Sequence, residues 1–114
     1  MFSDRFVNAL KATGFPVAHF GWEKERLPAG DYIVFAEDGA NDFMTGNRHA
    51  ERATEGTVDL FTRNYAQNAA EPVEQALEGL TGVAWSLNSI QYEEDTRYVH
   101  YEWVVGEYGE GSAV

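Results

Sequence analysis

The stretch that decides the fold spans residues 56–105 and contains three patterned segments, GTVDLFT (56–62), PVEQALEGL (72–80) and VAWSLNSIQYEEDTRYVHYEWVV (83–105). The first alternates apolar and polar residues, which is typical of a half-buried strand. The second begins with Pro72, a residue favoured at the first helical position, and carries apolar residues at helical spacing. The third predicts two strands joined by an acidic turn at 93–96. We therefore expect a strand, a helix and a β-hairpin in succession.

The apolar pattern of the hairpin changes phase within its first strand. Leu87 continues an alternation that begins at Val83, but the next apolar residues are Ile90 and Tyr92, one step out of phase. A bulge near residues 88 and 89 would return these side chains to one continuous buried face. In the second strand, alternation predicts a core face that consists of Val99, Tyr101, Trp103 and Val105.

Upstream of this stretch, the sequence predicts a helix over residues 4–13, with Ser3 as its N-cap. Pro16 then favours an extended segment over 17–22, at the edge of a sheet because proline cannot donate to a strand ladder. A further strand is expected over 32–36. Residues 38–47 carry few large apolar side chains and predict a long loop, which in a small domain is usually functional or disordered.

Together these elements predict an α+β fold, with a single antiparallel or mixed β-sheet, two α-helices packed mainly on one face, and a long loop between central strands. A short similarity between residues 9–15 and 76–83 suggests two α-β-β units that form one antiparallel sheet. We expect a single α+β domain over 1–105. The glycine-containing segment 106–114 is expected to be a flexible C-terminal tail.

Composition limits the classes of function. The 114 residues suffice for one domain with one modest core. Eight basic and nineteen acidic residues give a formal net charge of −11, which repels phosphate backbones and argues against general nucleic-acid binding. DNA could still pass through an assembly of such chains without sticking. The absence of cysteine excludes disulfides, thiol nucleophiles and sulfur-ligated zinc.

The N-terminal residues 1–10 contain no sustained apolar run. We therefore expect neither a signal peptide nor a membrane partner, and a protein made in the cytoplasm.

The sequence contains no recognisable catalytic constellation. His19, His49 and His100 lack metal-ligand spacing, and there is no nucleophile elbow or phosphate-binding loop. The acidic turn could bind a divalent ion or act in acid/base chemistry, but a solvated hairpin tip that blocks aggregation is the simpler interpretation. We expect a protein that is not an enzyme, with no catalytic residues, cofactor or metal.

Two alternatives of other classes stay open. One is a small ligand-binding or hydrolytic α+β domain that uses His100, Glu102 and Glu93, which predicts convergent polar groups in a deep pocket. The other is an acidic protein that mimics DNA and inhibits a DNA-binding protein.

The order of elements, together with the phrases DYIVF (31–35), VDLFT (58–62) and QYEEDT (91–96), resembles small tail-terminator or tail-completion proteins of long-tailed, siphovirus-like phages and prophages. The resemblance covers residues 3–105. It implies a virion protein, assembled in the bacterial cytoplasm, that forms a homo-oligomeric ring, commonly a hexamer. Such a ring caps the tail tube, contacts the tail tube protein and head-to-tail connector proteins, and meets DNA only as passing cargo. A head-to-tail connector or stopper protein is the nearest alternative.

The resemblance also implies that the long loop, residues 39–52 here, holds neighbouring subunits together. Charged residues in and beside it become candidates for ion pairs between subunits, and Trp22 and Phe43 become candidate apolar contacts. The predicted oligomer interface consists of Trp22, Asp42, Phe43, Arg48, Glu51, Arg52 and Glu55.

Overall fold

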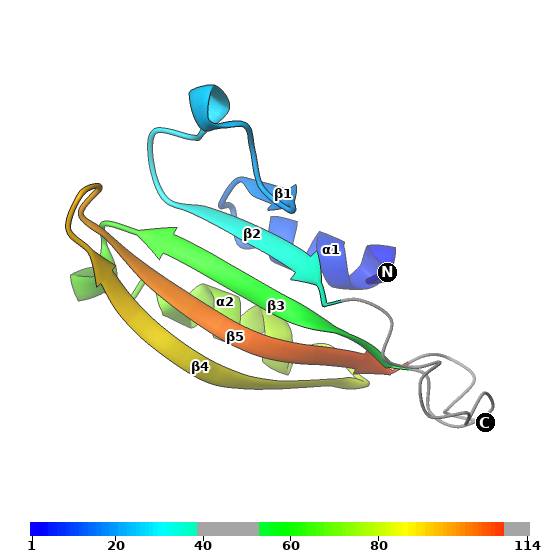
Figure 1. Cartoon of the computed structure of the whole chain (residues 1–114). Helices are drawn as coiled ribbons and strands as arrows, with labels where there is room; N and C mark the ends of the chain where they lie inside the picture. The colour runs from blue at the N-terminus through cyan, green and yellow to red at the C-terminus, as the bar shows by residue number, and fades with distance from the viewer. Residues whose placement is uncertain (39–52, 109–114) are drawn as a thin grey trace.

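The computed structural model describes residues 1–38 and 53–108 as one mixed, five-stranded sheet with two α-helices on one face (Figure 1). This confirms the predicted α+β fold. The elements follow one another as α1 (Asp4–Lys11), β1 (Val17–His19), the 3₁₀ turn η1 (Lys24–Arg26), β2 (Tyr32–Glu37), β3 (Ala53–Thr62), the 3₁₀ turn η2 (Tyr65–Gln67), α2 (Ala70–Glu78), β4 (Val83–Glu93) and β5 (Tyr98–Tyr108).

The strands lie in the order β1-β2-β3-β5-β4. All neighbours are antiparallel except β1 and β2, which are parallel. Residues 20–31, which include η1, carry the chain back so that β2 starts at the same end as β1, as a parallel pair requires. The predicted pair of α-β-β units in one antiparallel sheet is therefore wrong, although β1 does lie at an edge as Pro16 indicated.

The core lies between the helices and the face of the sheet that they cover. Phe6 and Leu10 of α1 and Val73 and Leu77 of α2 are fully buried there. They pack against alternate residues of the strands, namely Ile33, Phe35, Val58, Leu60, Trp103 and Val105. The core face predicted for β5 is thus confirmed at Trp103 and Val105.

The N-terminal helix is capped as the sequence predicted. The Ser3 hydroxyl accepts a hydrogen bond from the Phe6 amide, and the same hydroxyl donates to the carboxylate of Glu107. The Ser3 amide also donates to Glu107, at 2.8 Å. Glu107 is buried and belongs to β5, so the predicted flexible tail starts too early. Residues 106–108 complete the strand, and residues 109–114 lie outside the described part of the chain.

The second helix begins two residues before Pro72, at Ala70. Pro72 therefore occupies the first turn instead of the first position, where its missing N–H still costs no helical hydrogen bond. The helix ends at Glu78, with Gly79 as its C-cap.

The predicted bulge in the hairpin is confirmed by a register shift between Leu87 and Ser89. The continuous buried face that it was expected to restore is not formed. Ile90 and Tyr92 are 54% and 60% exposed, and Leu87 is 42% exposed. The hairpin end of β4, which carries Ile90 and Tyr92, extends past α2, so this helix does not bury the two side chains although they lie on the core face (Figure 1).

Five of the predicted interface residues, Asp42, Phe43, Arg48, Glu51 and Arg52, lie outside the described residues. Among the helices that the structure does describe, none is long and apolar enough to cross a membrane.

Candidate functional site

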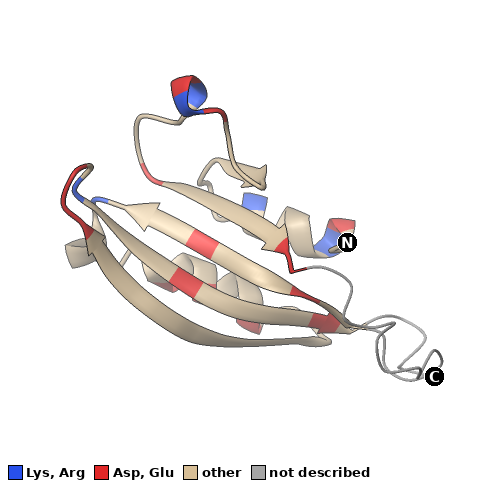
Figure 2. Ribbon diagram, in the orientation of Figure 1, with Lys and Arg blue, Asp and Glu red and all other residues tan. Residues whose placement is uncertain are grey.

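The face of the sheet opposite the helices carries a polar cluster at its centre. Because Val58 and Leu60 point into the core, alternation places Asp59 and Phe61 of β3 on the opposite, open face. Directly paired residues of neighbouring strands share a face. The register sets Asp59 opposite Glu102 and Phe61 opposite His100. Figure 2 shows the acidic residues side by side in the middle of β3 and β5.

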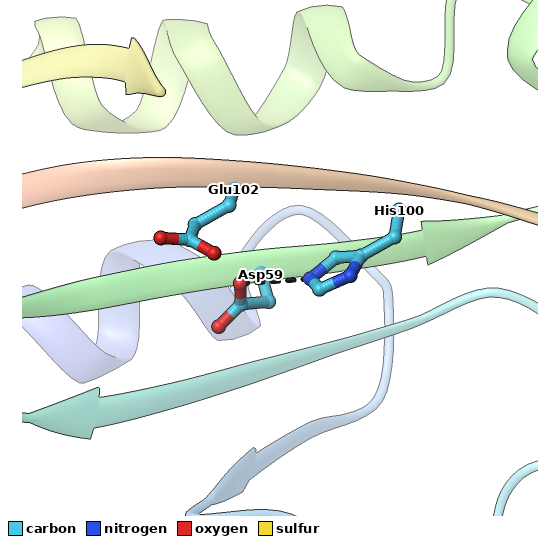
Figure 3. Close-up of side chains that lie close together, drawn as sticks. All are labelled: Asp59, His100 and Glu102. Carbon is cyan, nitrogen blue, oxygen red and sulfur yellow. Dashed lines mark hydrogen bonds and ion pairs between the residues drawn. The ribbon is translucent and has the colours of Figure 1, made fainter. Parts of the chain in front are cut away.

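Three of these side chains converge between the two strands (Figure 3). His100 Nε2 lies 2.9 Å from Asp59 Oδ1. One ligand-capable atom each from Asp59, His100 and Glu102 lie within 4.8 Å of one another. On the other side of the ring, His100 Nδ1 lies 3.7 Å from Glu93 Oε2.

Neighbouring groups hold each member of this cluster. The Thr57 hydroxyl donates to Asp59 Oδ2 at 3.2 Å, and the Asn88 amide donates to Glu102 Oε2 at 3.2 Å. The imidazole of His100 stacks on the ring of Phe61, with centroids 4.2 Å apart and planes 19° apart. The cluster is therefore built on rigid strands with its rings and carboxylates oriented.

The carboxylates change the acid–base chemistry of the imidazole. The hydrogen bond to Asp59 raises the pKa of His100 above its ordinary value of 6.5, and burial opposes the shift without cancelling it. The negative charges of Asp59, Glu93 and Glu102 add to the increase. His100 therefore holds its proton more tightly than a free imidazole does.

The residues predicted for a ligand-binding or hydrolytic site are thus not dispersed, since Glu93 and Glu102 both lie near the imidazole of His100. Two pockets of the described structure lie away from this cluster. One is a surface groove between α1 and α2, and the other lies at the far end of β3, β4 and β5, around Glu55 and Trp85. Neither of these two pockets is lined by His100, Glu93 or Glu102.

The sequence missed Asp59, the closest partner of His100. Alternation could place Asp59 on the face opposite Val58, and His100 and Glu102 on the face opposite Trp103. The register that brings the two strands together is not encoded in either strand alone.

The other histidine in the described residues lies in a separate ion pair. His19 Nε2 is 2.6 Å from Glu37 Oε1, on the helix side of the sheet. Burial alone would raise the pKa of Glu37, but the hydrogen bonds from His19 and the Phe2 amide outweigh it and lower that pKa.

The comparisons with known proteins give no relative. No protein-family model, curated protein or solved structure matches the chain significantly. The function must therefore be argued from the chain's own residues.

The predicted interface residues in the described structure are Trp22 and Glu55, and they lie apart. Trp22 is half-buried and packs edge-on against Tyr32, with ring centroids 5.4 Å apart. Glu55 is exposed near the start of β3 and lines the pocket beside Trp85.

A second feature is the outer edge of the sheet at β4. This strand has 11 residues and pairs with β5 on one side; no other described strand pairs with it. Its exposed apolar residues Leu87, Ile90 and Tyr92 follow one another along the helix side of the sheet, because the register pairs them with Trp103, Tyr101 and Val99. We call this strip of Leu87, Ile90 and Tyr92 the β4 strip.

Proposed function

We propose that this chain is a structural, non-enzymatic subunit that assembles with copies of itself into a ring, in the role of a tail terminator of a long-tailed phage or prophage. The observation that carries the proposal is the β4 strip on a long edge strand. The family resemblance of the sequence supplies the specific role, and the α+β fold agrees with what that resemblance implies.

Edge strands of soluble proteins are normally protected against pairing with another chain by lysine, proline, short length or a cover. The strand β4 contains no lysine, arginine or proline, and its one charged residue, Glu93, lies at its end. Its bulge gives partial protection at Leu87. Such an edge favours a partner that pairs with the strand and covers Ile90 and Tyr92.

A second copy of the chain is the occupant that this proposal names. A ring needs one interface repeated around a closed symmetry axis, so that even a modest contact becomes cooperative. The net charge of −11 suits the wall of a DNA conduit, because it repels the passing polyanion. In this role the ring is part of the virion and contacts the tail tube protein and the head-to-tail connector proteins.

Light scattering and negative-stain imaging of the full chain test the proposal. We expect closed rings, hexameric if the family pattern holds, and dissociation to monomers in the variant Ile90→Lys. The substitution adds a charge to a residue that is already half exposed, so the fold should survive, which circular dichroism checks. Val104→Lys is the matched control, since it makes a similar change at an exposed residue on the opposite face of β5.

The proposal fails if the wild-type chain stays monomeric at high concentration and forms no ring when tail tube protein is added. It also fails if Ile90→Lys assembles as well as the wild type. Co-purification separates the two roles, since a terminator binds the tail tube whereas a connector or stopper binds the portal.

A further inference from the structure

The centre of the open face holds like charges where a sheet ordinarily avoids them. Asp59 and Glu102 are direct cross-strand partners, and like charges directly opposite each other destabilise a sheet. Glu93 adds a third carboxylate on the far side of His100. The strands β2, β3, β4 and β5 contain no lysine or arginine within their bounds, so His100 is the one group of these strands that can carry a positive charge beside the three carboxylates.

We propose that Asp59, His100 and Glu102 bind a divalent transition-metal ion of the zinc class. One imidazole nitrogen and two carboxylate oxygens form a mixed donor set suited to such ions, whereas Ca²⁺ and Mg²⁺ prefer oxygen ligands alone. Three protein ligands leave at least one coordination position for water or for a group from another molecule.

The geometry requires little rearrangement. Ligands at about 2.1 Å from a tetrahedral ion lie roughly 3.4 Å from one another. His100 and Asp59 are already closer, at 2.9 Å, and all three donor atoms lie within 4.8 Å. His100 and Asp59 lie on the adjacent, paired strands β5 and β3, and their side chains are already in contact. Binding an ion between them therefore requires no movement of the backbone. Figure 3 shows Glu102 beside Asp59, and the three flexible torsions of Glu102 allow one of its oxygens to turn towards the same centre.

The surroundings of the three residues supply the outer contacts that metal sites use. A metal-bound histidine usually directs its other ring nitrogen to a carboxylate, and Glu93 stands 3.7 Å from His100 Nδ1. The hydroxyl of Thr57 donates to Asp59 Oδ2, the oxygen that His100 does not contact, and the side-chain amide of Asn88 donates to Glu102 Oε2. Every candidate ligand thus has an orienting partner of its own.

The competing interpretation is an ion pair in which His100 simply carries a proton between two carboxylates. The two interpretations differ in the role of Glu102. The ion pair of Asp59 with His100 needs no contact from Glu102, whereas a metal ion draws all three side chains onto one centre. Zinc binding must also expel the proton that His100 shares with Asp59, so binding should weaken as the pH falls.

Isothermal titration of the metal-free full chain with ZnCl₂, at neutral pH in a non-chelating buffer, tests the site. We expect one ion per chain, and a loss of affinity of at least about a hundredfold in Asp59→Asn, His100→Gln and Glu102→Gln, which exceeds the usual effect of changing an orienting residue. Asn88→Ala should lower the affinity by about tenfold. The matched controls Asp95→Asn and Glu94→Gln remove the same charges from the exposed hairpin turn and should bind as the wild type does.

Nuclear magnetic resonance of the imidazole nitrogens identifies the ligand directly. Zinc should shift the resonances of His100 and leave those of His19 in place. The inference is overturned if the wild type binds zinc no more tightly than His100→Gln, if only His19 responds, or if Glu102→Gln binds as tightly as the wild type. Stoichiometry per chain does not depend on ring formation, so this test and that of the proposed function can fail separately.

Discussion

Gly56 lies in the interior of β3, between Glu37 of β2 and Val105 of β5, at a point where the backbones come unusually close. A Cβ atom at this position would lie 2.0 Å from the carbonyl oxygen of Ala36. Since backbone cannot rotate away as a side chain can, Gly56→Ala must push two strands apart. We expect a loss of about 2 kcal/mol or more in the free energy of unfolding, measured by urea denaturation.

The control for this prediction is Gly30→Ala. Nothing lies within 4 Å of a Cβ built at Gly30, and its backbone is not left-handed. This variant should be neutral or slightly stabilising, because alanine restricts the unfolded chain more than glycine does. Equal losses at the two positions would show that the close approach of β2 to β3 does not constrain residue 56.

At His100 the prediction concerns pH. The pKa of His100 is raised in the folded protein, chiefly by the hydrogen bond to Asp59, so the folded state binds this proton more tightly than the unfolded state. The resulting stabilisation is complete below the ordinary value of 6.5 and is lost as the pH rises through the folded-state pKa. In metal-free buffer, the advantage of wild type over His100→Gln in urea midpoint should therefore shrink from pH 5.5 to about pH 9.

Titration of the His100 resonance by nuclear magnetic resonance measures the same quantity directly. Asp59→Asn removes the leading cause of the shift and should bring the pKa down towards 6.5. An advantage of the wild type that grows with pH would have the wrong sign and would contradict the assignment.

Among the elements, α2 is bound to β5 by a partly buried hydrogen bond. The indole N–H of the fully buried Trp103 donates to Glu74 Oε2 at 2.9 Å. Glu74→Ala would leave this donor without its partner, at a cost of about 1–3 kcal/mol in unfolding free energy, while Glu74→Gln keeps an acceptor and should cost less. Urea denaturation followed by tryptophan fluorescence gives both values.

The same helix offers an internal comparison. Glu78 accepts the indole N–H of Trp85 at 3.0 Å, but this hydrogen bond is exposed, so water can replace it. We expect Glu78→Ala to cost less than Glu74→Ala. The reverse order would mean that burial does not decide how much these two hydrogen bonds contribute to the free energy of unfolding.

The comparison between elements also shows what the sequence could predict. Periodicity placed the two helices, the core strands and the bulge near Asn88, because these depend on neighbours along the chain. It did not predict the parallel pairing of β1, which depends on the path of residues 20–31, or the end of β5. Gly106 is a residue type that is common in loops, so the sequence suggested that β5 ends before it. Two hydrogen bonds order this end of the strand, one from the Ser3 amide to Glu107 and one from the Tyr108 amide to the Gly82 carbonyl. Both join distant parts of the sequence.

The candidate site shows the same limit. The chemistry of His100 and Glu102 was visible as a possible site because they lie two residues apart on one strand face. Asp59 was absent from it because it comes from another strand, 41 positions earlier in the chain. The exposure of Ile90 and Tyr92 was equally hidden, since alternation gives the face of a residue but not the length of the helix that covers that face.

The whole molecule combines a high negative charge with a bare apolar strip, and these oppose each other in any self-assembly. Each copy carries a net charge of −11, which repels the next copy, while contact along the β4 strip removes Ile90 and Tyr92 from water. Salt screens the repulsion between copies, because the Debye length falls from about 30 Å at 0.01 M to about 8 Å at 0.15 M. The burial of Ile90 and Tyr92 stays almost unchanged over this range. If the proposed ring forms through β4, its assembly should therefore tighten as salt is raised over this range.

Sedimentation velocity at several protein concentrations measures this as a shift in the monomer–oligomer equilibrium, which we expect to be about tenfold or more towards the oligomer. The opposite result is informative about the interface. Ion pairs between subunits, of the kind predicted for Arg48, Glu51, Arg52 and Glu55, weaken when salt is added. Rings that dissociate at higher salt would therefore contradict assembly through the β4 strip and assign the contact to those charged residues. Ile90→Lys distinguishes the two cases independently, because it disrupts an apolar contact at every salt concentration and leaves an interface made by the charged residues intact.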